Sequence, residues 1–296
     1  MKQLVVISGK GGTGKTVISA CFAALSKKKV IADCDVDAAN LQLLLHGNIQ
    51  ETHPFSGSKK AIIDQEKCTG CGECVSVCRY EAIGETDKCV IHIDPLSCEG
   101  CHLCYYICPA EAIEMEKSLS GEWFVSRTEY GPFVHARLGI GEENSGKLVT
   151  EVRKKAKQIA EQDELDFILI DGPPGIGCPV IASLSGTDLA LVVTEPSLSG
   201  IHDMERVTQM ARHFGVPTAC CINKFDLNLR NTEYIQSLCE RNSVPLVGKV
   251  PFDENITESM VQGIPLVEYS NNSTSDNIKS IWKKLKQLLE KKEVQR

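Results

Sequence analysis

Two groups of residues in this chain have types and spacings that indicate chemistry. The first is a glycine-rich segment that matches the phosphate-binding pattern G-x4-G-K-S/T, and it reads Gly9-Lys10-Gly11-Gly12-Thr13-Gly14-Lys15-Thr16. The second is a set of cysteines in two runs of the form C-x2-C-x2-C-x3-C: Cys68, Cys71, Cys74 and Cys78, then Cys98, Cys101, Cys104 and Cys108. Backbone amides in the first group suit phosphate oxygens, and thiolates in the second suit iron.

The phosphate-binding loop predicts a nucleotide site. Its glycines let backbone N–H groups approach phosphate oxygens, and the following helix adds its positive end. We expect Lys15 to reach the β and γ phosphates and the Thr16 hydroxyl to bind Mg2+. A glycine-rich turn with a chance lysine is the alternative. Residues 3–8 predict a buried strand before the loop and residues 16–24 predict a helix after it, which favours the nucleotide site.

The cysteine runs have the spacing of bacterial ferredoxins, in which the fourth cysteine of each run ligates the cluster of the other run. This predicts two 4Fe-4S clusters. Cluster one takes Cys68, Cys71, Cys74 and Cys108, and cluster two takes Cys98, Cys101, Cys104 and Cys78. Zinc is the alternative, because C-x2-C pairs also hold zinc. The runs repeat with an offset of thirty residues that continues through Glu-Ala-Ile at 81–83 and 111–113, and this duplication favours two clusters.

Arg79 departs from the ferredoxin pattern, since it stands where a proline follows the last cysteine, as Pro109 does in the second run. A proline there shapes a turn and ligates no iron, so the predicted ligands are unchanged. The remaining cysteines form no C-x2-C pair, and we expect them to pack in the core. They are Cys21, Cys34, Cys89, Cys178, Cys220, Cys221 and Cys239.

Apolar runs that alternate with helical stretches place these motifs in an α/β fold. We expect further strands at 29–33, 167–170, 189–194, 218–222 and 245–250, and further helices at 145–162 and 276–292. Asn144 or Ser145 is expected to cap the first of these helices. We predict a P-loop domain at 1–60 and 117–296, with a mostly parallel sheet and helices on both faces. An inserted ferredoxin-like module at 61–116 would carry the two 4Fe-4S clusters.

The phosphate loop resembles the deviant Walker A loop of the ATPase family that includes MinD, ParA, the nitrogenase iron protein and Mrp. The resemblance implies that Lys10 crosses a dimer interface to the nucleotide of the facing subunit. The segment from Ile31 to Leu41 also resembles this family. Its residue Asp35 matches the aspartate that positions the attacking water and supports Mg2+. Asp33 and Asp37 are alternatives, and the position at the strand end favours Asp35.

Two later segments resemble the same family. Asp171-Gly-Pro-Pro-Gly175 is similar to the switch II segment of the Mrp branch, which implies that Asp171 acts on Mg2+ through water. Asn223 matches the asparagine that holds the edge of adenine, and residues 250–253 match a second loop beside the base. The choice of ATP rests on this resemblance, because the relatives are ATPases.

The whole chain resembles MinD-superfamily ATPases that contain an inserted ferredoxin domain. This implies an ATPase whose ATP binding and hydrolysis gate electron transfer through two clusters. It also implies an ATP-dependent homodimer, or a heterodimer with a paralogue, and a redox or metal–sulfur protein as partner. The C-terminal C-x2-C that bridges a cluster across the Mrp dimer is absent here, so cluster delivery by that route is not expected.

Two other functions are weighed against this one. A positioning or scaffold ATPase similar to MinD and ParA would have structural or sensory clusters. A ferredoxin with a vestigial nucleotide site is disfavoured, because Lys15, Thr16, Asp35 and Asp171 are intact. The polar segment 135–147 is expected either to contact nucleotide, cluster module or partner, or only to begin a capped helix.

Composition excludes some classes of partner. The 296 residues carry a net charge of −7, which is unlike the basic surface of a nucleic-acid binder. No apolar run approaches the roughly 18 residues that a membrane span needs. Met1 leads directly into the first strand without a signal peptide, so we expect a cytoplasmic protein. The helix at 276–292 is expected to pack on the sheet and not on a membrane.

Overall fold

The computed structural model describes residues 1–86, 90–139, 142 and 145–291. The chain forms two compact units. The first unit comprises Met1–Thr52, Trp123–Arg137 and Ser145–Arg296, and the second comprises His53–Glu122 and Leu138–Asn144. Both cysteine runs belong to the second unit, and the phosphate loop belongs to the first. No helix among the described residues has the length and apolar character needed to cross a membrane.

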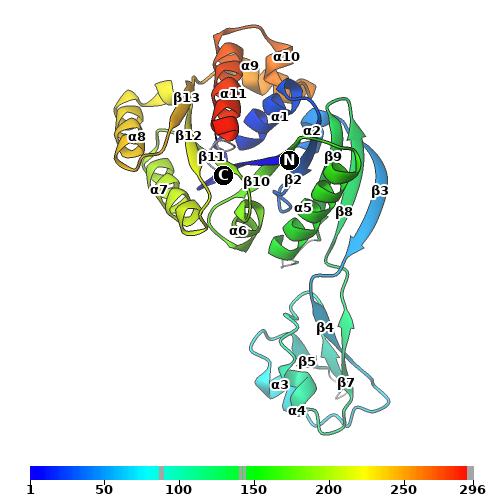
Figure 1. Cartoon of the computed structure of the whole chain (residues 1–296). Coiled ribbons are helices and arrows are strands. Elements are labelled where there is room, and N and C mark those ends of the chain that lie inside the picture. Colours follow the sequence, from blue (N-terminus) through cyan, green and yellow to red (C-terminus); the bar gives the residue numbers. More distant parts are fainter. Residues whose placement is uncertain (87–89, 140–141, 143–144, 292–296) are drawn as a thin grey trace. The chain divides into compact units, whose positions relative to one another are not determined.

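A sheet with the strand order β13-β12-β11-β1-β10-β2-β9-β8-β3 forms the centre of the first unit (Figure 1). The strands are β1 (Lys2–Ser8), β2 (Lys29–Asp33), β3 (Asn48–Phe55), β8 (Gly121–Thr128), β9 (Gly131–Leu138), β10 (Phe167–Pro174), β11 (Leu189–Thr194), β12 (Thr218–Asn223) and β13 (Leu246–Val250). All neighbours from β13 to β9 pair in parallel. The predicted strands and the mostly parallel sheet are thus confirmed.

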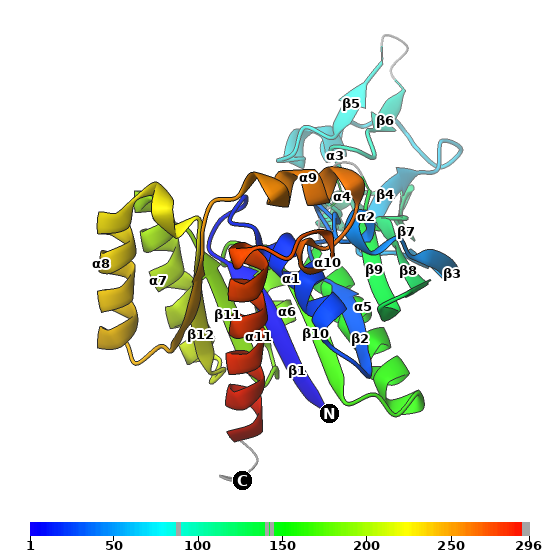
Figure 2. The same ribbon diagram turned by 90° about the horizontal axis from the view of Figure 1, so that it is seen from above.

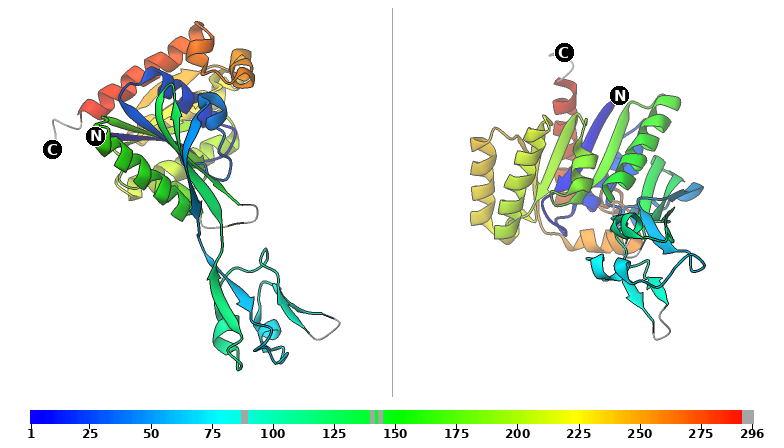
Figure 3. Two further views of the ribbon diagram at one scale, coloured as in Figure 1. Left: turned by 90° about the vertical axis from the view of Figure 1, so that its right-hand side faces the viewer. Right: turned by 90° about the horizontal axis from the view of Figure 1, so that it is seen from below.

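Helices cover both faces of this sheet. One face carries α1 (Lys15–Leu25), α9 (Glu254–Gln262), α10 (Leu266–Tyr269) and α11 (Ser273–Lys291), which Figure 2 shows in front of the strands. The other carries α5 (Ser145–Gln162), α6 (Cys178–Leu184) and α7 (Leu198–His213), seen from below in Figure 3, with α8 (Leu229–Arg241) beyond α7. The apolar side of α11 is buried, and its Trp282 ring lies 5.0 Å from that of Phe22 in α1. The predicted C-terminal helix therefore packs in the core.

Two details differ from the sequence prediction. Strands β3, β8 and β9 extend the sheet, although residues 117–143 gave no clear pattern and 48–55 was not predicted to be a strand. Strand β10 also continues past Ile170 to Pro174, because Ser8 pairs with Pro174 at the end of β1. Helix α5 has the predicted bounds and begins at Ser145, one of its two expected caps, whereas the other, Asn144, lies outside the described residues.

The second unit consists of two similar halves. They contain β4 (Lys59–Ile63), α3 (Glu73–Val77) and β5 (Ile83–Glu85), then β6 (Ile91–Ile93), α4 (Leu103–Ile107) and β7 (Ile113–Lys117). The helices α3 and α4 are offset by the thirty residues of the sequence repeat. Strand β4 pairs antiparallel with β7, and β5 pairs antiparallel with β6. Each small sheet therefore takes one strand from each half, and the halves are intertwined.

Candidate functional site

The phosphate loop connects β1 to α1 in a conformation that depends on glycine. Gly12 and Gly14 have φ angles of +76° and +89°, in the left-handed region. A Cβ atom at Gly14 would clash with the side-chain amide of Asn223. That amide donates to the carbonyl of Thr13 over 2.8 Å, and Lys224 Nζ donates to the carbonyl of Gly12 over 3.0 Å. The end of β12 thus holds the loop in place.

A cavity of about 800 Å³ lies against this loop, within the size range of small-molecule sites. Its polar wall includes Gly11, Gly12, Gly14, Lys15, Thr16, Asp35, Asp37, Asn223 and Lys224. Its apolar wall includes Leu43, Phe252, Ile256 and Met260. The lining therefore combines polar groups that suit phosphate with apolar side chains that suit a base. Because the carboxyl ends of parallel strands meet at this edge, residues from β1, β2, β10 and β12 gather there.

The three aspartates after β2 lie in different surroundings. Asp33 is buried, and its carboxylate accepts the N–H groups of Asp35, at 3.0 Å, and of Leu41, at 3.3 Å. Asp35 and Asp37 line the cavity instead. Burial raises the pKa of Asp35 to about 6, and the nearby charge of Lys15 opposes this rise. Asp33 therefore shapes the turn, while Asp35 presents a carboxylate to the cavity.

Asp171 is buried beside the loop with one oxygen atom unpaired. Its Oδ1 accepts a hydrogen bond from the Ser19 hydroxyl at 2.6 Å. Its Oδ2 and the Thr13 Oγ1 are buried and have no hydrogen-bond partner among the described residues. Burial raises the pKa of Asp171, against the hydrogen bond from Ser19 and the charge of Lys15. Since buried polar atoms without partners are costly, these oxygens fit a site for a hydrated cation and phosphate.

Lys10 is held by groups of its own subunit in this structure. Its Nζ forms an ion pair with Glu195 over 2.6 Å and donates to the hydroxyls of Ser197 and Ser199 at 3.1 and 3.0 Å. Glu195 also pairs with Lys224 over 3.2 Å. Burial raises the pKa of Glu195, but hydrogen bonds from Lys10 and Lys224 outweigh it and hold the pKa below its ordinary value. The connection from β11 to α7 thus restrains Lys10.

The eight cysteines of the two runs line two cavities, four to each. Cys68, Cys71, Cys74 and Cys108 line one, and Cys78, Cys98, Cys101 and Cys104 line the other. The structure therefore brings together each predicted set of ligands, including the fourth cysteine from the opposite run. Isoleucines and Met115 supply apolar walls. Among the described residues, no three His, Cys, Asp or Glu side chains converge closely enough to hold a single metal ion.

The other cysteines mostly pack in the core. Cys21, Cys34, Cys220, Cys221 and Cys239 are buried, as expected. Cys178 is exposed at the start of α6, so the prediction of core packing is wrong for it. Its position directly after the loop that follows Asp171 explains the exposure. Cys89 lies outside the described residues.

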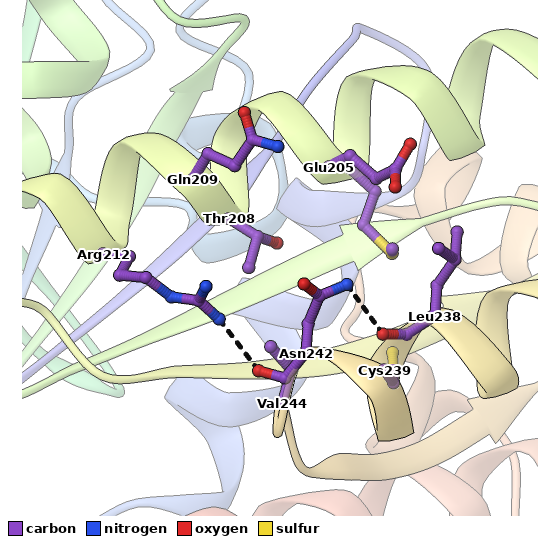
Figure 4. A pocket seen from close by; sticks show the side chains of 9 residues that line it. Glu205, Thr208, Gln209, Arg212, Leu238, Cys239, Asn242 and Val244 are labelled. Atoms are coloured by element: carbon purple, nitrogen blue, oxygen red, sulfur yellow. Dashed lines mark hydrogen bonds between the residues drawn. The ribbon is translucent and has the colours of Figure 1, made fainter.

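A smaller cavity lies between α7 and α8, away from these motifs (Figure 4). Arg212 donates to the carbonyl of Asn242 over 2.9 Å, and the Asn242 amide donates to the carbonyl of Leu238 over 2.9 Å. Both contacts pair groups at the C-terminal end of α8. We therefore assign these contacts a structural role.

Sequence reasoning missed three polar residues of the nucleotide site. Ser19 follows Thr16 by one helical turn on α1, and its burial in an apolar helix was the available signal. Glu195 and Ser197 lie far from Lys10 in the sequence, and no motif links them to it. Only the parallel order of β1 and β11 brings them together.

A mostly parallel α/β sheet with a glycine-rich loop between its central strand and a helix defines a P-loop nucleotide-binding protein. The chain belongs to the CobQ/CobB/MinD/ParA nucleotide binding domain family, whose model matches residues 4–266. Members of the MinD and ParA branches are ATPases.

Relatives agree with this assignment. The chain is 33% identical, over 291 residues and 97% of both chains, to an uncharacterized protein of Methanocaldococcus jannaschii. It is 30% identical over 154 residues to the iron-sulfur cluster carrier protein of Pyrococcus furiosus, which covers 47% of this chain and 52% of the relative. The septum site-determining protein MinD of Pyrococcus horikoshii, solved with Mg-ADP, superposes with a TM-score of 0.60 at 20% identity over 97% of this chain and 96% of that one.

Proposed function

We propose that this protein is an ATPase in which ATP binding and hydrolysis gate electron transfer through two 4Fe-4S clusters. The observation that carries the proposal is the pair of cavities lined by four cysteines each, in one chain with the nucleotide cavity. When bound, the clusters supply one-electron transfer. The intertwined halves of the second unit support a ferredoxin-like module, because its cross-ligation needs cysteines from both halves.

The placement of the thiols favours clusters over zinc. Each thiolate of a cubane binds a different iron, so the four sulfurs surround a hollow. A zinc ion needs four ligands within about 2.3 Å of one point. Cysteines around a cavity suit the first arrangement. The partial similarity to an iron-sulfur cluster carrier protein supports the same choice.

For hydrolysis, we assign each polar residue of the nucleotide cavity one role. The loop amides and Lys15 bind the phosphates, and Thr16 together with Asp171, through water, holds Mg2+. A bound Mg2+ ion would neutralise charge that develops on the phosphates. Asp35 accepts a hydrogen bond from the attacking water. A new bond forms between water oxygen and the γ phosphorus while the bond to the bridging oxygen breaks, which yields ADP, phosphate and a proton.

Two further roles complete the proposal. Asn223 holds the edge of adenine, and its place in the cavity wall supports this. Lys10 leaves Glu195 and crosses to the nucleotide of a second subunit when ATP promotes dimerisation. The ion pair with Glu195 would then distinguish the resting subunit from the dimer. A redox or metal–sulfur protein would be the electron-transfer partner.

The test is a reductive titration of the anaerobically purified protein, followed by EPR, with and without MgATP. We expect MgATP to shift the potential of at least one cluster in the wild type and not in Lys15→Ala. Lys27→Ala removes an exposed lysine just after α1 and serves as the matched control. A wild-type protein with full iron content and no shift would overturn gating.

A scaffold or positioning ATPase is the second candidate. The similarity to a septum site-determining MinD favours it. Under this alternative the clusters are structural or sensory. ATP hydrolysis would then proceed, and the reduction potentials of both clusters would be the same with and without MgATP. The same titration therefore separates the two functions.

A further inference from the structure

Three buried residues that contain sulfur lie together in the first unit, apart from the two cysteine runs. They are Met204 on α7, Cys220 on β12 and Cys239 on α8. The Cys220 thiol donates a hydrogen bond to the Met204 thioether over 3.7 Å. Interaction with the side chain of Cys239 is the largest of the effects that raise the pKa of Cys220, so the second thiol lies beside the first. The proposed function uses none of these three side chains.

The backbone ties the two cysteines to one short connection, the one that leads from α8 to β13. Val244 donates its N–H to the carbonyl of Cys239 over 2.8 Å. Cys220 donates its N–H to the carbonyl of Pro245, also over 2.8 Å. Because residues 244 and 245 are neighbours in the chain, these hydrogen bonds hold α8 and β12 together at the level of both cysteines. The fold itself therefore brings the two thiols to one place.

The next residue of β12, Cys221, has quite different surroundings. It belongs to the apolar core that contains Phe22 and Trp282, on the face of the sheet that α1 and α11 cover. Burial alone raises the pKa of Cys221 to about 12. Cys220 instead contacts Met204 of α7, on the other face. The three sulfurs are thus grouped on one side of β12, and Cys221 is a buried thiol outside the group.

The cavity between α7 and α8 leads to this group (Figure 4). Met204 and Cys239 both line it, and so does the exposed side chain of Gln209. It shares no lining residue with the nucleotide cavity. Two of the three sulfur-bearing side chains therefore border a hollow near the surface that is separate from the nucleotide site.

Two thiols and a thioether are the donors that the soft cation Cu(I) prefers. A metal–thiolate bond is about 2.3 Å long, so three sulfurs around one ion in a plane lie about 4 Å apart. The 3.7 Å between the sulfurs of Cys220 and Met204 is close to this spacing. Zinc fits less well, because its structural sites take four ligands. In the part of the chain that the structure describes, no third His, Cys, Asp or Glu converges with the two thiols.

We propose that Met204, Cys220 and Cys239 form a binding site for one Cu(I) ion. The ion bonds to both cysteine sulfurs and to the Met204 thioether. The two thiol protons leave to the solvent as the ion binds, and no electron is transferred. This inference is independent of the proposed function, since it involves neither the clusters nor the nucleotide.

The copper content of matched variants tests the site. Each protein is purified anaerobically, so that bound clusters stay intact, and is titrated with Cu(I) against the chelator bathocuproine disulfonate. We expect the wild type to bind one Cu(I) per chain more than Cys220→Ala or Cys239→Ala. The difference between proteins cancels copper that binds to other thiols. Cys221→Ala is the matched control, because it removes an equally buried thiol from the neighbouring position, and it should bind as much copper as the wild type.

Selenomethionine labelling identifies the third ligand without a substitution in the site. The chain has five methionines, and selenium at Met204 should add a copper–selenium contribution to the X-ray absorption spectrum at the copper edge. Labelled Met204→Leu should lose this contribution. Its affinity for Cu(I) should fall roughly tenfold, which is about 1.4 kcal/mol of binding free energy. Leucine conserves the volume of the side chain, so this variant keeps the core packed.

Three results would overturn the site. Equal copper content in the wild type, Cys220→Ala and Cys239→Ala would mean that Cu(I) binds only to other thiols. Loss of one copper in Cys221→Ala as well would show that removal of any buried thiol has this effect. A labelled wild type that binds copper without a copper–selenium contribution would remove Met204 from the ligands and with it the three-sulfur site.

Discussion

At the scale of single residues, the most informative groups are the two buried oxygens without partners, Asp171 Oδ2 and Thr13 Oγ1. A folded protein tolerates such atoms where a bound species completes their hydrogen bonds. Ser19 orients Asp171 by pairing with its other oxygen. The fold therefore orients this carboxylate before a cation binds.

We expect Asp171→Asn to lower kcat for ATP hydrolysis by roughly tenfold or more, about 1.4 kcal/mol of transition-state stabilisation. The neutral amide keeps the shape of the side chain but no longer attracts hydrated Mg2+. Phosphate release under saturating MgATP measures the effect. Asp163→Asn, an exposed position just after α5, is the control and should retain the wild-type rate. A wild-type kcat in Asp171→Asn would remove this residue from the magnesium site.

The sequence predicted those residues of this site that lie in contiguous motifs. Lys15 and Thr16 lie in a pattern whose spacing alone implies the loop, and the cavity wall contains both. Ser19 and Glu195 had no such pattern, because their contacts depend on helix phase and on strand order. Long-range pairing of this kind is a property of the fold and has no local signal.

At the scale of elements, polar residues inside the sheet explain why β8 and β9 were not predicted. Ser126, Thr128 and His135 are buried, so the strands lack the apolar alternation that identifies a half-buried strand. Ser126 and His135 instead pair across the hairpin, with Ser126 Oγ and His135 Nε2 2.9 Å apart, and Thr128 Oγ1 donates to the carbonyl of Gly131 over 2.9 Å. Strand β3 was not predicted for another reason. Most of its side chains are exposed, so it lacks a buried apolar pattern.

The same hairpin predicts a pH dependence of stability. Burial lowers the pKa of His135 to about 4, and Phe124 and Phe133 stack on its ring with centroids 5.0 and 4.6 Å away. In the unfolded chain the pKa of His135 is near 6.5. Between about pH 4 and pH 6.5, the unfolded state therefore binds more protons than the native state. The contribution of His135 to the free energy of unfolding therefore falls as pH decreases below about 6.5, by about 2 kcal/mol at pH 5.

Urea denaturation at pH 7 and pH 5 measures this effect as a difference between variants, which cancels the titration of other groups. Compared with wild type, His135→Gln should lose less stability on acidification, because glutamine keeps a hydrogen bond to Ser126 without a titrating ring. His213→Gln replaces an exposed histidine and should follow the wild type. Equal losses in all three proteins would show that His135 does not titrate abnormally.

At the scale of the whole molecule, the chain passes between its two units four times, at residues 52–53, 122–123, 137–138 and 144–145. The sequence repeat and the P-loop indicated the two parts. The sequence did not assign the segment Leu138–Asn144, which contains Glu142, to the second unit. An ion pair between residues 82 positions apart, such as Lys60 and Glu142, has no sequence signature.

The division of the cysteines between the two cavities gives a test of the second unit as a whole. If the fourth cysteine of each run serves the other cluster, Cys108→Ser and Cys71→Ser should lose the same EPR signal, although they lie in different runs. Cys78→Ser and Cys101→Ser should lose the other signal. Each variant should retain about half of the iron, since one cubane loses a ligand and the other keeps all four. Cys178→Ser, outside both cavities, should keep both signals. A shared loss by Cys78→Ser and Cys71→Ser would instead mean that each run holds its own cluster, and the intertwined arrangement of the halves would then have no role in ligation.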